Sequence, residues 1–166
     1  MRVIFLDCDG VLNSHKFFST SKDDQSIDGL NFGEAQLDPQ ALALLDNLIE
    51  QTGAQIVISS SWRHIWDWQE IAKMFEKRGM ENWDFVIGQT ITSNQDNRGA
   101  EVMAWLDTGR ERQVVDDKHE AVTAWVILDD TDEFDSTQHN NFVRTNPKVG
   151  LTAADVQKAI QILKRG

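Results

Sequence analysis

The sequence has only one cysteine and no long hydrophobic run, and both absences narrow its class. Cys8 has no second cysteine to pair with, which excludes an internal disulfide, so we expect a reducing compartment and no disulfide-linked partner. No apolar run approaches the roughly 20 residues that span a bilayer. The N-terminus also lacks the basic stretch and the cleavage site of a signal peptide. We therefore expect a cytoplasmic protein without a membrane partner.

Positive charge is also scarce. The chain carries 16 Lys and Arg against 27 Asp and Glu, for a net charge of −11. A uniformly acidic surface repels duplex nucleic acid, whose binding proteins present basic stripes. This disfavours a protein that coats DNA or RNA. It leaves room for a small basic site for one phosphate, and for acidic residues gathered around a metal.

Two glycine-dependent nucleotide motifs are absent as well. The chain has no Walker loop and no Gly-x-Gly-x-x-Gly, which disfavours a nucleoside triphosphatase and a Rossmann dehydrogenase. An EF-hand also fails, because its sixth position requires glycine and the acidic run 130–135 has Asp135 there.

What the sequence does contain is an alternation of short apolar runs and amphipathic helical patterns. With 166 residues, 40% of them hydrophobic, the chain suits one domain over residues 1–166 with one core. The alternation predicts an α/β fold, a three-layer α/β/α sandwich with a mostly parallel central sheet and no large cap domain. We expect the strands at residues 3–6, 56–58, 85–87, 125–128 and 142–143.

Helix signals lie between these strands. Asp38 suits an N-cap, Pro39 the first helical position and Gly53 a stop. Further helices are expected over 65–79, with Ile65 on the buried face, over 98–106, and from Thr152 onward. The polar stretch 14–37 is predicted to be a loop or flap, too short for a folded cap, and the charged stretch 107–123 to be irregular.

Three of the apolar strands run directly into polar residues, at Asp7, Ser59 and Asp129. Ligands of open parallel sheets bind beyond the carboxyl ends of the strands. We therefore expect these three positions, far apart in the sequence, to meet in one crevice.

The first of these ends reads Asp7-Cys8-Asp9-Gly10. Period-two geometry points both carboxylates the same way, and Gly10 permits a sharp turn and the close approach of a ligand. One carboxylate can attack a phosphoryl group, while the other protonates the leaving oxygen and later deprotonates water. An isolated Asp-x-Asp is more often a solvated turn, but the strand before it and Gly-Val-Leu-Asn after it favour a site.

The next candidates, two serines and an arginine, are suited to binding phosphate. Ser59 and Ser60 follow a strand and can bond a phosphoryl oxygen without crowding it, although a serine there also suits helix capping. Arg98 can offset the charge of phosphate and carboxylates, or it can be an exposed arginine in the first turn of a helix. The sequence leaves these two interpretations of Arg98 equal.

The last candidate is the acidic pair Asp129-Asp130, which follows a strongly apolar strand. Acids at a strand end repel one another unless a cation lies among them. Ligands with oxygen atoms only suit Mg²⁺, which binds few carboxylates and the phosphate of a substrate. An ordinary acidic loop is the alternative, but it does not explain the apolar strand before it.

In this order, the motifs resemble those of the haloacid dehalogenase superfamily over about the whole chain. A narrower resemblance is to the phosphatase-like domain of the Swiss Army Knife RNA-repair group, and it rests on residues 59–63, Arg98-Gly99 with Glu101, 128–130, 143–145 and 150–152.

The resemblance implies a role for each candidate residue. Asp7 is the nucleophile and Asp9 the general acid/base. Mg²⁺ is held by the Asp7 carboxylate, the backbone carbonyl of Asp9, and Asp129 or Asp130. Ser59 orients the phosphoryl group, and Arg98 stands where the family usually has lysine. Cys8 is expected to be a buried packing residue.

The substrate class stays open at this point. A site without a cap would admit nucleic-acid ends, with His15, Lys16, Arg63 and His64 as candidate rim residues and Trp62 or Trp66 as candidate stacking residues. Each of these is, singly, more often an ordinary surface or packing residue. The alternatives are a nucleotide or small-metabolite phosphatase and a binding module that has lost activity. Retention of both Asp7 and Asp9 argues against the last.

Overall fold

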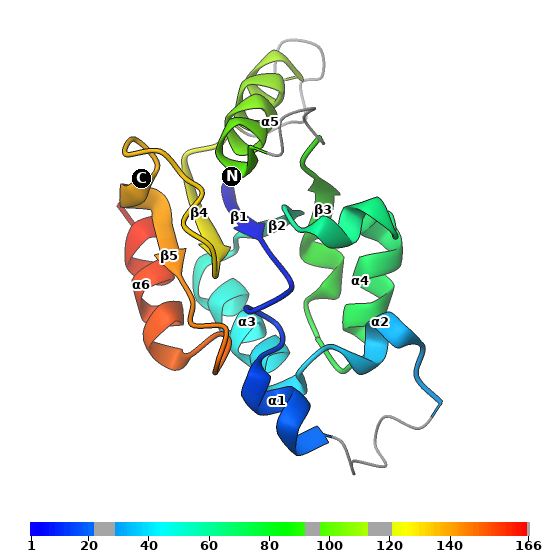
Figure 1. The fold of residues 1–166 in the computed structure, drawn as a ribbon. Coiled ribbons are helices and arrows are strands. Elements are labelled where there is room, and N and C mark those ends of the chain that lie inside the picture. Colours follow the sequence, from blue (N-terminus) through cyan, green and yellow to red (C-terminus); the bar gives the residue numbers. More distant parts are fainter. Residues whose placement is uncertain (22–28, 92–96, 113–120, 166) are drawn as a thin grey trace.

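A five-stranded sheet forms the centre of the protein, in a computed structural model that describes residues 1–21, 29–91, 97–112 and 121–165 (Figure 1). The strands lie in the order β3-β2-β1-β4-β5, and every neighbouring pair is parallel. This confirms the predicted fold class, with the first strand in the middle. That residues 1–166 form one domain stays a prediction. The strands are β1 (Arg2–Leu6), β2 (Gln55–Ile58), β3 (Val86–Gln89), β4 (Ala124–Asp129) and β5 (Phe142–Arg144).

Helices cover both faces of the sheet. Ile4 and Leu6 of β1 belong to the larger apolar core, which three helices share, and Val3 and Phe5 belong to a second core under a fourth helix. Strand β1 is therefore buried on both faces, so its carboxyl end is fixed in the middle of the molecule. The three helices on one face are α3 (Pro39–Thr52), α4 (Trp68–Lys77) and α6 (Ala153–Leu163), and the helix on the other is α5 (Arg98–Arg112).

The helix caps follow local sequence signals. The Asp38 carboxylate accepts a hydrogen bond of 2.9 Å from the Gln40 N–H, Pro39 opens α3, and Gly53 ends it with φ of 63°. Thr152 forms a capping box with Asp155 at the start of α6. No helix in the described part of the chain is long and apolar enough to cross a membrane.

The stretch 14–37 is more ordered than predicted. Ser14 caps a short helix, α1 (His15–Thr20), and Asn31 caps another, α2 (Phe32–Ala35), through a capping box with Glu34. A loop or flap was predicted for this stretch without naming these two helices, for which short capping signals suffice over one or two turns. Residues 22–28 of the predicted flap lie outside the described residues.

Three predicted boundaries were wrong. Ile65, expected on a buried helix face, is 69% exposed, because it follows the 3-10 turn η3 (Ser61–His64) and α4 begins only at Trp68, where Asp67 is the N-cap. Phe85 belongs to the 3-10 turn η4 (Trp83–Phe85), and β3 starts one residue later. Helix α5 continues to Arg112, since a nucleated helix propagates through polar residues. Residues 113–120 lie outside the description.

Candidate active site

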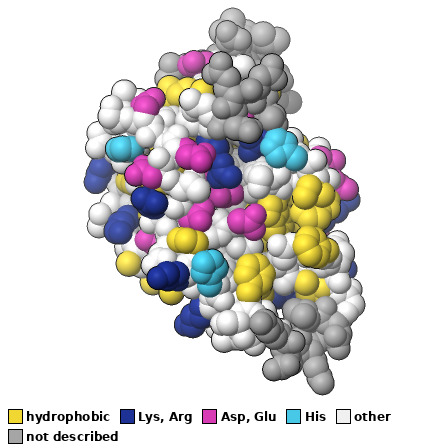
Figure 2. All heavy atoms as spheres, viewed as in Figure 1, with side chains coloured by type: hydrophobic (Ala, Val, Ile, Leu, Met, Phe, Trp, Pro, Cys, Tyr) yellow, Lys and Arg dark blue, Asp and Glu magenta, His cyan; other side chains and the backbone are white. Residues whose placement is uncertain are grey.

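Asp7 stands where β1 ends, between the ends of its two neighbours. Its N–H donates to the Leu128 carbonyl on β4 at 3.0 Å, and the Ser59 N–H after β2 donates to the Leu6 carbonyl at 2.8 Å. The carboxyl ends of β2, β1 and β4 therefore meet at one edge, as predicted for Asp7, Ser59 and Asp129. Figure 2 shows acidic side chains in the middle of this face, with Lys and Arg side chains beside them.

The turn after Asp7 depends on Gly10. Its φ is 73°, and a Cβ there would lie 2.5 Å from the Asp130 carboxyl carbon, so a side chain is excluded by both strain and space. The Gly10 N–H donates to Asn13 Oδ1 at 2.9 Å, which closes the turn. Cys8 is fully buried within it, as expected for a packing residue.

Arg98 bridges two buried carboxylates from the start of α5. A single atom, Nη1, lies 2.8 Å from Asp7 Oδ2 and 2.5 Å from Asp129 Oδ2. Of the two interpretations of Arg98, the structure therefore excludes the exposed surface residue. Burial lowers the pKa of the guanidinium, but the charges of Asp7 and Asp129 outweigh this effect and raise it above its ordinary value.

The pKa of Asp7 is affected by the charged groups around it. Burial, and then the charge of Asp129, raise the pKa of Asp7 from 3.8 to about 6, while Arg98 and a hydrogen bond from Ser60 act against this rise. The rise has a physical cause, since two negative groups lie close together in a site shielded from water.

Asp7, Asp129 and Asp130 form an acidic trio, with one carboxylate oxygen of each within 4.8 Å of the others. Burial and the charge of Asp129 raise the pKa of Asp130 as well. Thr131 donates two bonds of 2.8 Å to Asp129 Oδ1, so the orientation of that side chain is fixed. Three carboxylates against one guanidinium leave negative charge uncompensated, and a donor set of oxygens fits a hard divalent cation.

The Asp9 carboxylate lies at the rim, outside this trio. Trp62 Nε1 donates to Asp9 Oδ2 at 3.1 Å, and Asn13 Nδ2 donates to Asp9 Oδ1 at 2.9 Å. Neither contact was predicted from the sequence. Trp62 itself is 4% exposed and packs against Trp66 with ring centroids 5.3 Å apart. Trp62 is therefore not available to stack on a base.

The two serines after β2 have different surroundings. The Ser60 hydroxyl accepts a bond of 3.3 Å from the Trp62 N–H and so caps η3. The Ser59 hydroxyl is buried and has no hydrogen-bond partner among the residues that the structure describes. A buried hydroxyl without a partner costs free energy, so Ser59 is the serine free to bind a ligand.

Arg63 is not a rim residue on the surface. Its side chain is 4% exposed, pairs with Glu101 at 2.5 Å and donates to the Ser60 carbonyl at 2.8 Å. The pair forms one wall of a cavity of about 350 Å³ beside the acidic trio, which is lined by Ser61, Arg63, His64, Arg98, Glu101 and Glu133. The sequence marked Glu101 only through the family resemblance, so its ion pair was not foreseen.

A comparison with models of protein families shows to which family the chain belongs. The model of the HAD domain in Swiss Army Knife RNA repair proteins matches residues 3–156 of the 166. The chain belongs to this family. Searches of curated proteins and of solved structures each found no match. Membership indicates a phosphatase of the haloacid dehalogenase type, a family that acts on phosphorylated substrates and typically uses a divalent metal. The roles of the individual site residues stay predictions.

Proposed function

We propose that this protein is a Mg²⁺-dependent phosphomonoesterase that works through an aspartyl-phosphate on Asp7. The observation that carries the proposal is the acidic trio, in which a buried Asp7 lies beside Asp129 and Asp130 at the end of the central strand. Arg98 bonds Asp7 Oδ2 and Asp129, while Asp7 Oδ1 accepts a hydrogen bond of 2.8 Å from the Cys8 N–H and keeps a lone pair for attack.

In the first step, an Asp7 oxygen bonds to phosphorus while the bond from phosphorus to the ester oxygen breaks. The leaving oxygen takes a proton from Asp9, whose position at the rim suits a group that meets the alcohol side of the substrate. Trp62 and Asn13 hold the two Asp9 oxygens and so set the direction of the carboxyl group. The unpartnered Ser59 hydroxyl and Arg98 bind the phosphoryl oxygens.

In the second step, Asp9 removes a proton from water, and the water oxygen attacks phosphorus. The bond from phosphorus to Asp7 breaks, inorganic phosphate leaves and the Asp7 carboxylate is restored. Asp7, Asp129 or Asp130, and the backbone carbonyl of Asp9 would hold Mg²⁺. When bound, the ion neutralises phosphoryl charge and draws the substrate into place.

The proposed substrate is the terminal phosphate of an RNA or DNA end. Support comes from the family, which is named for RNA repair proteins, and from the exposed Asp9 at the rim of the site. A nucleotide or a small metabolite remains the second candidate, since the cavity of about 350 Å³ beside Arg98 can receive a compact leaving group. An inactive binding module is the third, and the retention of Asp7, Asp9, Ser59 and the pair Asp129-Asp130 argues against it.

The test is a phosphatase screen with Mg²⁺ over nitrophenyl phosphate, mononucleotides, sugar phosphates and oligonucleotides with a terminal phosphate. Asp7→Asn should abolish turnover, and Asp84→Asn, the same change at an exposed site on η4, should not. Excess chelator should stop the reaction and Mg²⁺ should restore it. Turnover by Asp7→Asn would exclude the nucleophile, and more efficient hydrolysis of a mononucleotide or sugar phosphate would replace the end-repair substrate.

A further inference from the structure

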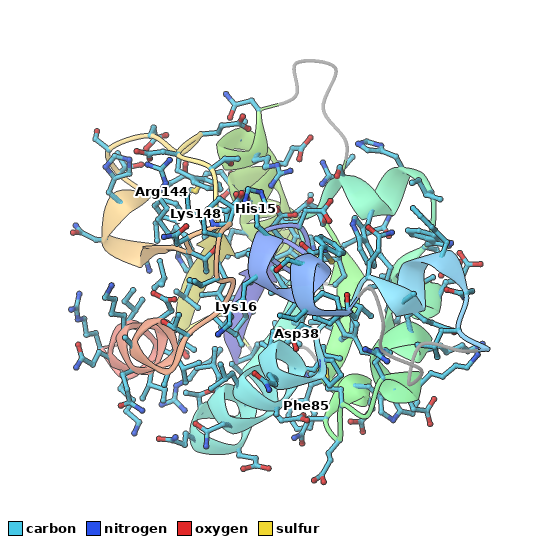
Figure 3. All side chains as sticks on the ribbon, turned by 60° about the horizontal axis from the view of Figure 1, so that its bottom comes forward. His15, Lys16, Asp38, Phe85, Arg144 and Lys148 are labelled. Carbon is cyan, nitrogen blue, oxygen red and sulfur yellow. The ribbon has the colours of Figure 1, made fainter. Side chains whose placement is uncertain are left out.

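We infer that a basic edge beside the acidic trio binds the backbone phosphates of a single nucleic-acid strand, behind the terminal nucleotide. This inference rests on the proposed action on nucleic-acid ends and adds where the strand lies. The basic edge consists of four side chains from two segments: His15, Lys16, Arg144 and Lys148. Figure 3 shows His15, Arg144 and Lys148 near one another, with Lys16 on the side toward Asp38.

The two segments of the basic edge are bonded to each other. The N–H groups of His15 and Lys16, in the first turn of α1, donate to the carbonyls of Pro147 and Lys148 at 3.0 Å each. Backbone contacts fix the relative position of the segments, so their long side chains extend from a common base.

The same segments are bonded to the turn that follows the nucleophile. The Thr145 hydroxyl donates to the Gly10 carbonyl at 2.9 Å, and the Leu151 N–H donates to the Val11 carbonyl at 2.9 Å. A Cβ on Gly150 would lie 3.2 Å from the Asn13 carbonyl, which shows how closely the backbones approach. The basic edge is therefore part of the same rigid body as the active-site turn.

Arg144 is the member nearest the acidic trio. It pairs in register with Asp129 across β4 and β5, and its Nε donates to the Asp130 carbonyl at 3.1 Å. The side chain is 58% exposed, and its ion pair with Asp132 is long, at 3.6 Å. A phosphate next to the site can thus replace Asp132 as the partner of this guanidinium at little cost.

The other three side chains of the basic edge are available to a ligand. His15, Lys16 and Lys148 are exposed, and none has a carboxylate within 4.0 Å in the part of the chain that the structure describes. Asp38 lines the same cavity as Lys16, but its carboxylate caps α3. The two unpaired lysines and Arg144, with His15 beside them, are a local exception in a chain with a net charge of −11.

A strand fits this arrangement better than a small ester does. A mononucleotide has one phosphate, which the active site takes, and so leaves no charge for the basic edge. A strand places its next phosphates outward from the site, where these side chains lie. The acidic remainder of the surface repels a wider polyanion such as a duplex. Contacts to phosphate alone predict binding that depends on salt and not on base sequence.

The test measures binding without turnover. Asp7→Asn protein with Mg²⁺ is titrated into a labelled single-stranded oligonucleotide with a terminal phosphate, at several salt concentrations. Contacts from Lys16, Lys148 and Arg144 predict a slope of log affinity against log salt of about −2, and loss of both lysines should reduce its magnitude by about 1.4. The variants are Lys16→Ser with Lys148→Ser, Lys16→Arg with Lys148→Arg to restore the slope, and Lys158→Ser with Lys164→Ser on α6 as a control of equal charge.

Equal slopes for the two serine double variants would overturn the basic edge, as would equal competition by polyglutamate of matched charge. Thermal melting confirms that each variant is folded. Turnover of nitrophenyl phosphate by the wild-type chain is measured in parallel. If the ester is hydrolysed but the slope does not depend on the lysines, only the proposed binding of a nucleic-acid strand to the basic edge is refuted. If the slope depends on the lysines but no ester is hydrolysed, the proposed phosphatase activity is refuted and the proposed binding of a strand to the basic edge stands.

Discussion

The indole N–H of Trp62 donates to the carboxylate of Asp9, 53 positions away in the sequence. Because Trp62 is almost fully buried, this bond connects the proposed acid/base to the core and limits the directions that its carboxyl group can take. Trp62 is thus a positioning residue for Asp9.

Replacing Trp62 by Phe should remove this donor while keeping most of the packing. A hydrogen bond to a charged group contributes about 1.5–3 kcal/mol, so we expect kcat to fall roughly ten- to hundredfold with KM nearly constant. Trp66→Phe, which changes the ring that packs against Trp62, is the control for packing. A loss of equal size in both variants would mean that Trp62 acts through packing alone.

Asp9→Asn should remove both proton-transfer steps and cost roughly 10²–10⁴ in rate. The loss should shrink for nitrophenyl phosphate, whose leaving group needs no proton. Steady-state rates for that ester and for a simple alkyl phosphate, measured on the same variant, provide the comparison. An identical loss for the two esters would count against Asp9 as the acid.

Arg98→Lys should keep most of the activity that Arg98→Ala loses. One nitrogen of Arg98 contacts both Asp7 and Asp129, so a single ammonium can serve the same two partners. We expect Arg98→Ala to lose about 10²–10³ in kcat/KM, by analogy with removal of one donor to a transition-state oxygen. If the alanine variant matches the wild type, another cation has the role. Lys73 is then the one to test, since Arg63 is already paired with Glu101.

The raised pKa of Asp7 predicts a pH-dependent cost to stability in the metal-free protein. The folded pKa of about 6 exceeds the ordinary 3.8, so the folded chain binds more protons than the unfolded chain between these values. Stability is therefore lost as pH rises through this window, by up to about 3 kcal/mol.

Asp7→Asn has no such titration. Urea unfolding in chelator should show the difference in unfolding free energy, variant minus wild type, rising from pH 4 to pH 7 and then levelling off. Mg²⁺ should reduce this difference at pH 7, because the wild-type site binds it more strongly. A difference that does not change with pH would contradict the assignment of the shift to Asp7.

Local signals were enough to predict much of the fold. The capping of α3 by Asp38 and its stop at Gly53 depend on neighbours in the sequence, and so does the end of β1 at Asp7. The convergence of Asp7, Ser59 and Asp129 followed from the general rule for parallel strands. For the residues at the centre of the site, both their place in the fold and their type of side chain could therefore be predicted from the sequence.

The missed features depend on contacts between distant residues or on competing local signals. No pattern in the sequence connects Trp62 with Asp9, or Arg63 with Glu101, because each pair meets only after the helices pack. Ile65 fits the helical period, but the Asp67 capping box starts the helix later and leaves Ile65 in water. A period alone does not decide between two possible starts of one helix.

The bond between Thr145 and Gly10 joins residues 135 positions apart, and β1 lies between β2 and β4. Asp7 is therefore synthesised well before many of the residues that surround it in the folded protein. A growing chain contains the proposed nucleophile long before Asp129 and Arg144 can reach it. Because such distant pairings make folding slow, the catalytic turn should become protected from amide hydrogen exchange only in the final folding phase.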